Sequence, residues 1–135
     1  LFRNGIIEAL DISAVRVHGS EKPSIPSKEL VGALIKSIRR YSVLLKSLEV
    51  EFPAFCFVTL TNVRGCILEL GSQSHYQPVI DRDTLQLPEI FFENYSVDLE
   101  TAMKPALDAL WNASGYPRCT FYDETTGQWA GPLNW

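Results

Sequence analysis

The sequence predicts an α+β domain in which an antiparallel sheet, built on a β-hairpin, packs against two long helices. Three patterns predict this fold class. Apolar residues recur every three or four positions over 28–48 and again over 99–113, and aromatic, β-branched runs lie between these segments. The expected order along the chain is helix, three strands, helix and two strands, or α-β-β-β-α-β-β.

Composition indicates a single globular domain in a reducing compartment. The chain has 135 residues, of which 46% are hydrophobic and 21% are charged, and no apolar run approaches the ~18 residues that span a bilayer. Its cysteines, Cys56, Cys66 and Cys119, include no C-x-x-C pair and leave one thiol over under any disulfide scheme. We therefore expect a cytoplasmic protein that contacts no membrane and holds neither a metal ion nor another cofactor.

The first 27 residues are predicted to form an N-terminal connector, and the α+β domain is predicted to occupy 28–135. The segment 18–27 contains a glycine and two prolines, which indicates a surface link without regular structure. Ser27 is well placed to cap the first helix, because its hydroxyl can accept a bond from an amide of the opening turn. We expect that helix to cover 28–48.

The face of this helix opposite its apolar stripe carries a row of cations, which are Lys36, Arg39, Arg40 and Lys46. Such a row is able to contact phosphate, but on most helices it is simply the hydrated side. The net charge of −4 repels nucleic acid on average, so any phosphate contact must be local to this row.

The strands are predicted between the two helices. An apolar run at Ala54–Thr61 and an alternating run at Cys66–Leu70 flank Asn62–Gly65, which predicts a β-hairpin. The first run is apolar on both faces, so we expect it to lie centrally and to be covered on both sides. A third strand is expected at Leu85–Phe92, where Pro88 confines it to an edge or a bulge.

The second apolar repeat predicts a helix over Leu99–Ala113, with Ser96 or Asp98 as its cap. Gly115 follows this segment and is a typical stop residue. Pro105 predicts a kink in the turn before it, or a restart of the helix there, because proline lacks the backbone donor and clashes with the preceding turn.

Aromatic residues gather near the C-terminus. The segments 120–122 and 128–130 are predicted to pair as a terminal hairpin, which brings Phe121 close to Trp129. Asp123 and Glu124 lie among these aromatics, and this acidity argues against a platform for stacking bases. The remaining interpretations are core packing and a protein contact, for which the candidate residues are Tyr116, Trp129 and Trp135.

The candidate residues for a metal site or an acid/base pair are Asp81 and Asp83, which form a D-R-D pattern with Arg82. On an extended segment both carboxylates point the same way, as a divalent metal ion or an acid/base pair requires, although such residues also form solvated turns. His75 lies in the same loop, where it could act as a base for Cys66 or Ser74. The chain contains no G-x-S-x-G, H-E-x-x-H, P-loop or G-x-G-x-x-G motif, and we expect no catalytic residue.

Several segments resemble one bacterial family. They are Ile80–Asp83 (IDRD), Leu87–Ile90 (LPEI) and, above all, Met103–Arg118 (MKPALDALWNASGYPR), and Ala33–Gly65 fits as well. By these segments the chain resembles the C-terminal region of AlbA/Schlafen-type DNA-binding proteins, which are often described as ATP-binding proteins or transcriptional regulators. In that family an AlbA-like domain on the N-terminal side is expected to meet the nucleic acid. The resemblance transfers no functional residue and implies an accessory domain of a longer protein.

The expected function is that of a non-catalytic accessory or oligomerisation domain of a bacterial DNA-binding regulator. Its partners are then a second copy or other domains of the same protein, and it meets nucleic acid only indirectly. The alternative is a small metal-dependent hydrolase or nuclease-like domain that uses Asp81, Asp83 and His75.

Overall fold

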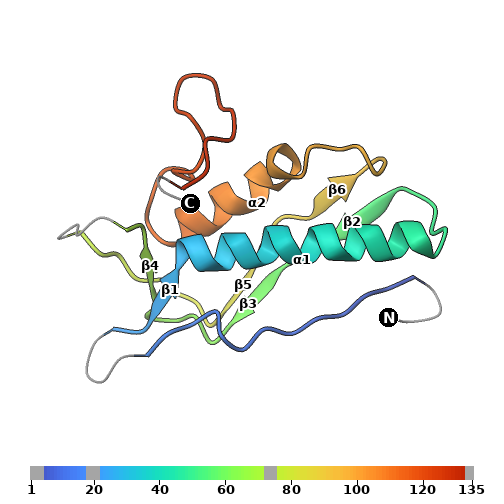
Figure 1. Cartoon of the computed structure of the whole chain (residues 1–135). Helices are drawn as coiled ribbons and strands as arrows, with labels where there is room; N and C mark the ends of the chain where they lie inside the picture. Colours follow the sequence, from blue (N-terminus) through green and yellow to red (C-terminus); the bar gives the residue numbers. More distant parts are fainter. Residues whose placement is uncertain (1–4, 18–21, 72–75, 133–135) are drawn as a thin grey trace.

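The architecture is a small α+β fold in which two helices lie on one side of a set of short strands (Figure 1). The computed structural model describes residues 5–17, 22–71 and 76–132. In chain order the elements are β1 (Ser24–Pro26), α1 (Ser27–Ser47), β2 (Ala54–Cys56), β3 (Thr59–Thr61), β4 (Ile67–Glu69), β5 (Thr84–Gln86), β6 (Ile90–Phe92) and α2 (Leu99–Ala113).

Most of the strands belong to one long, irregular β-hairpin with arms at 54–67 and 79–92. β2 pairs with β6 and β3 pairs with β5, both antiparallel, and an isolated bridge between Ile67 and Val79 extends the pairing. The predicted hairpin between 54–61 and 66–70 is therefore wrong, because those two segments lie on the same arm. Asn62 has a φ of 58°, and this left-handed backbone kinks the arm instead of reversing it.

A bulge at Pro88 keeps one face of the hairpin turned to the core. The β2–β6 pairing ends at Cys56↔Ile90 and the β3–β5 pairing begins at Thr59↔Gln86, so residues 57–58 oppose residues 87–89. One strand thus carries an extra residue beside a proline that has no N–H to donate, as the sequence predicted. Leu87 before the bulge and Ile90 after it are both buried.

β1 overturns the prediction that 18–27 lacks regular structure. Ser24–Pro26 pair in parallel with β4, and the amide of Ser24 donates to the carbonyl oxygen of Arg16 over 2.8 Å. Ile25 is fully buried in the core. A proline is tolerated here because Pro26 ends the strand and continues directly into α1, where its missing donor costs no ladder bond.

α1 begins one residue earlier than predicted, and Ser27 does not cap it. The helix covers Ser27–Ser47 with Pro26 as its N-cap residue. The Ser27 hydroxyl donates instead to the backbone carbonyl of Glu69, which ties the start of the helix to β4. The buried positions Leu30, Val31, Ile35 and Ile38 follow the predicted apolar stripe.

α2 has the predicted limits but is the shorter helix, with 15 residues against 21 in α1, so only α1 is long. It runs without a break through Pro105, and the predicted restart is wrong. Thr101, whose carbonyl loses its helical partner to Pro105, is exposed and can bond to water. Asp98 is the N-cap residue by position, although its side chain makes no capping bond to the backbone.

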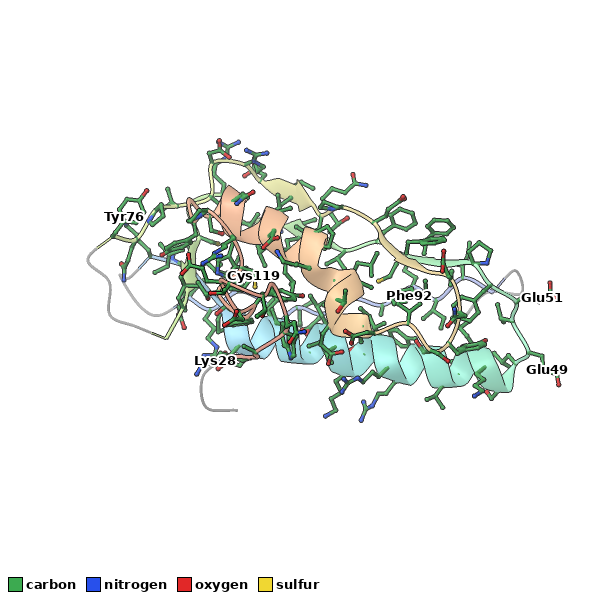
Figure 2. All side chains as sticks on the ribbon, turned by 90° about the horizontal axis from the view of Figure 1, so that it is seen from above. Lys28, Glu49, Glu51, Tyr76, Phe92 and Cys119 are labelled. Atoms are coloured by element: carbon green, nitrogen blue, oxygen red, sulfur yellow. The ribbon has the colours of Figure 1, made fainter. Side chains whose placement is uncertain are left out.

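The core lies between the helices and the inner face of the hairpin. Trp111 of α2 is fully buried and meets the ring of Phe121 edge to face, with the ring centroids 5.1 Å apart. Phe92, labelled in Figure 2, packs against this core from β6. Within the described ranges, neither helix combines the length and the apolar character that crossing a bilayer requires.

We expect Gly115→Ala to destabilise the fold by roughly 2–4 kcal/mol, because it combines backbone strain with a clash. Gly115 has a φ of +80°, and an added Cβ would lie 2.7 Å from Cβ and Cγ of Pro78. Gly65 is the matched control, since its φ is +81° but nothing lies within 4 Å of the point that an added Cβ would occupy. Urea unfolding should show a loss of roughly 1–2 kcal/mol for Gly65→Ala. Equal losses for the two variants would contradict the close packing of Gly115 on Pro78.

Candidate interaction surface

The face of the hairpin that points away from the helices carries an exposed aromatic cluster. Phe55, Phe57 and Phe91 expose 51%, 63% and 43% of their surface, and we call these three residues the phenylalanine patch. Along residues 54–61 the odd positions are exposed, whereas Leu60 is buried and the other even positions are at least partly buried. The prediction that this strand is covered on both faces is wrong for the described structure, because only one face meets the helices.

The patch is ordered by strand pairing. Phe55 and Phe91 stand directly opposite each other in the β2–β6 register, and their ring centroids lie 5.2 Å apart. Cross-strand aromatic pairs of this kind stabilise a ribbon, but they also keep their outer surfaces in water. A contiguous group of large exposed apolar side chains is typical of a protein-binding surface, whereas single exposed residues are common everywhere.

Carboxylates surround this patch in the sequence and in the fold. Glu51 precedes β2, and Glu89 and Glu93 flank β6; all three are exposed. The segments 49–61 and 84–98 contain no lysine, arginine or histidine. Within the described residues, none of these three carboxylates forms an ion pair. We call Glu51, Glu89 and Glu93 the acidic rim, and Figure 2 shows Glu51 projecting from this end of the molecule.

The structure divides the predicted row of cations on α1 into two groups. Arg39 forms an ion pair with Glu100 of α2, and the Lys46 ammonium lies 5.8 Å from the centroid of the Tyr95 ring. Lys36 and Arg40 are exposed and form no ion pair with a described residue. Two of the four cations thus bind the chain itself, and the other two point into solvent.

The face of α1 that carries Lys36 and Arg40 also carries an exposed apolar residue. Val43 lies about one turn beyond Arg40 and exposes 71% of its surface. We call Lys36, Arg40 and Val43 the α1 outer stripe. This stripe lies opposite the buried positions of the helix, and Figure 2 shows nitrogen-tipped side chains projecting from the side of α1 away from the strands.

The D-R-D pattern does not bring two carboxylates together at one point. Asp81 accepts a bond from Arg82 Nε over 2.8 Å, and Asp83 accepts two bonds from Arg64 over 3.1 and 3.3 Å. The hydrogen bond from Arg82 and its charge lower the pKa of the Asp81 carboxyl. His75 lies outside the described residues. Within them, no group of three His, Cys, Asp or Glu side chains could hold a metal ion.

The C-terminal aromatics pack mainly within the chain. Trp129 is half-buried and meets Tyr122 and Phe121 edge to face, at centroid distances of 5.1 and 6.1 Å. The predicted terminal hairpin is reduced to a single bridge between Tyr122 and Trp129, although the predicted contact of Phe121 with Trp129 is confirmed. Tyr116 is half-buried against Tyr76, and Trp135 lies outside the described residues.

A polar network on α2 holds the start of this C-terminal segment. Asp108 accepts bonds from the Cys119 amide over 2.8 Å and from Lys104 Nζ over 2.6 Å. The Tyr122 hydroxyl donates to the carbonyl oxygen of Glu100 over 2.5 Å. Burial raises the pKa of the Cys119 thiol to about 12, and burial also raises the pKa of Tyr122. A thiol in this environment stays protonated and is a poor nucleophile.

The phenylalanine patch is the surface that sequence reasoning missed. The sequence contains a pattern that indicates this exposed surface, because the outward positions change from Phe55 and Phe57 to Thr59 and Thr61 within one run. An apolar run that ends in outward threonines indicates a face that is not buried along its whole length. The aromatic character of the first two outward residues concealed that boundary.

Comparisons with known proteins give no information on the role of the phenylalanine patch, so its role is argued from the geometry alone. No protein-family model, curated protein or solved structure matches the chain. The similarity to AlbA/Schlafen-type proteins therefore stays a prediction from sequence segments.

We expect the free energy of unfolding to fall as the pH rises above about 9, because the folded state retains protons that the unfolded chain releases. The pKa of Cys119 is 9.0 in an exposed thiol and about 12 in the fold. Its contribution to stability is therefore complete below the unfolded pKa and is lost between these values, by up to about 1.4 kcal/mol per pH unit for this group. Urea unfolding from pH 8 to 11 measures the slope, and Cys119→Ala should reduce it. An unchanged slope in that variant would contradict the burial of this thiol.

Proposed function

We propose that this chain is a non-catalytic accessory domain that works by self-association through the phenylalanine patch. The single observation that supports this proposal is the exposed, register-paired couple of Phe55 and Phe91 on a face that no described residue covers. Aromatic side chains of this kind are enriched at the centres of protein interfaces.

The patch by itself supplies part of the free energy that an interface needs. Full burial of a phenylalanine side chain is worth about 1.5–3 kcal/mol, and each ring here still exposes about half of its surface. Covering the three rings therefore contributes on the order of 3 kcal/mol, before the cost of association. The surroundings of the patch must supply the rest of the affinity and the choice of partner.

Among the described residues, the candidate chemistry offers no observation that favours a reaction. Each of Asp81 and Asp83 is bonded to an arginine, and Cys66 and Cys119 are buried. A metal-dependent reaction needs carboxylates that converge on one ion, and a thiol reaction needs an accessible thiolate. These arrangements favour a binding role for the domain.

The proposed setting is a larger bacterial regulator in which another domain contacts DNA. This part rests on the sequence resemblance alone. It agrees with the charge of the patch, because an acidic rim repels the phosphate backbone and favours a protein partner. Contacts with other domains of the same protein are the alternative use of the same surface.

We expect wild-type protein to associate with rising concentration and Phe91→Ser to weaken this association at least tenfold, because a serine removes the apolar centre of the patch. Sedimentation velocity over a range from about micromolar to millimolar measures the effect. Leu10→Ser is the matched control, since Leu10 exposes 88% of its surface but lies in the N-terminal segment, outside the hairpin. Circular dichroism melts verify that both variants fold. A wild-type protein that stays monomeric throughout this range would overturn the proposal.

A further inference from the structure

We infer that the phenylalanine patch of one copy is covered by the α1 outer stripe of a second copy, in a head-to-tail contact. This inference rests on the proposed function and names the surface that the patch recognises. It joins three observations: the acidic rim, the unpaired cations of the stripe, and the exposed apolar side chains on both surfaces.

Ion pairs within the chain leave these two surfaces with opposite charge. Described cations that pair with a carboxylate of the same chain include Arg16, Arg39, Arg64, Arg82, Lys104 and Arg118. Lys36 and Arg40 form no such pair in the described part of the chain, and neither do the three carboxylates of the acidic rim. The stripe and the phenylalanine patch lie on opposite faces of the fold, so the stripe of one copy can reach the patch and the acidic rim of another.

Exposed apolar side chains lie at the C-terminal end of α1 as well as on the patch. Val43 belongs to the stripe, and Leu44 and Leu48, which lie further round the helix, also expose part of their surface. A helix with basic residues followed by apolar ones can place its apolar end on the phenylalanines and its cations over the carboxylates. The outer face of the hairpin would then be covered by a helix, as its inner face already is.

The placement of the two surfaces requires a head-to-tail contact. Both helices lie on one side of the strands (Figure 1). The stripe lies opposite the buried positions of α1 and so faces away from those strands. One copy can therefore offer its patch to one neighbour and its stripe to another. Such a heterologous contact builds a chain of copies, or a ring if the rotation closes.

A symmetric contact between two patches is disfavoured by charge. It would bring Glu51, Glu89 and Glu93 of one copy against the same residues of the other, with no cation in either segment to separate them. Like charges that face each other across an interface weaken binding and select against that arrangement. The cations of α1 remove this repulsion and replace it with attraction.

Two blocking variants test the contact in the full chain. Phe55→Ser with Phe91→Ser removes the aromatic couple of the patch but keeps the stripe, and Lys36→Glu with Arg40→Glu reverses the charge of the stripe but keeps the patch. We expect each variant alone to associate at least tenfold more weakly than the wild type by sedimentation velocity. An equimolar mixture should form a one-to-one dimer, because each variant keeps the surface that the other has lost. Lys22→Glu, at an exposed cation outside the stripe, should associate like the wild type.

A pair of charge reversals repeats the test without altering an aromatic residue. Glu89→Lys with Glu93→Lys makes the rim basic, so this variant should not self-associate. Mixing it with Lys36→Glu and Arg40→Glu restores attraction between the rim of one variant and the stripe of the other, and association should recover. The recovery should weaken in high salt, because exposed charges are screened beyond about 10 Å at 0.1 M salt.

The outcomes separate this inference from the proposed function. Wild-type-like association that survives Lys36→Glu with Arg40→Glu, or blocked variants that fail to combine, overturns the stripe as partner and leaves a self-associating patch. The stripe is also overturned as partner if its variant loses binding to a DNA duplex while its self-association is unchanged, because the stripe is then a phosphate contact. A wild-type protein that never associates overturns both proposals.

Discussion

The antiparallel pairing of 54–61 with 84–92 is the constraint on which the rest of the structure depends. Its one-residue bulge at Pro88 allows Leu85, Leu87 and Ile90 all to point toward the helices, although the spacing of these residues does not fit a regular strand. The same register sets Phe91 opposite Phe55 on the outer face. The apolar core and the exposed aromatic couple are therefore two consequences of one pairing, and neither can be changed without the other.

Most polar contacts of the chain hold its own parts together. Arg39 joins α1 to α2 through Glu100, and Asp108 fastens the C-terminal segment to α2 through the Cys119 amide. Arg64 holds the return arm of the hairpin through Asp83. Among the described charges that form no ion pair, Glu51, Glu89 and Glu93 lie around the patch, and Lys36 and Arg40 lie on α1. The proposed contact between the patch of one copy and α1 of another follows from this division of charge.

Features set by local chemistry could be predicted from the sequence, whereas long-range pairing could not. The limits of α2, the stop at Gly115 and the bulge at Pro88 follow from helical periodicity and from the backbone preferences of glycine and proline. The strand that pairs with 54–61 could not be predicted in this way, because 66–70 and 84–92 both have strand character. The residues at 62–65 suit either a turn or a kink. Among the candidate site residues, the basic row on α1 was predicted from the sequence. Which of its cations form an internal pair depends on the position of Glu100, and the ion pair of Asp83 likewise depends on the position of Arg64. The exposure of Phe55 and Phe57 depended on which face the helices cover.

Hydroxyl-radical footprinting tests most directly whether the patch is open in one copy and covered by a second. The oxidation rates of Phe55, Phe57 and Phe91 report the solvent exposure of these side chains, and the buried Phe121 supplies an internal reference. The account predicts that the three rings oxidise several-fold faster than Phe121 in dilute protein and become protected, together with Val43, as the concentration rises. Slow oxidation of the three rings at the lowest concentration would contradict it, because the chain itself would then cover the patch.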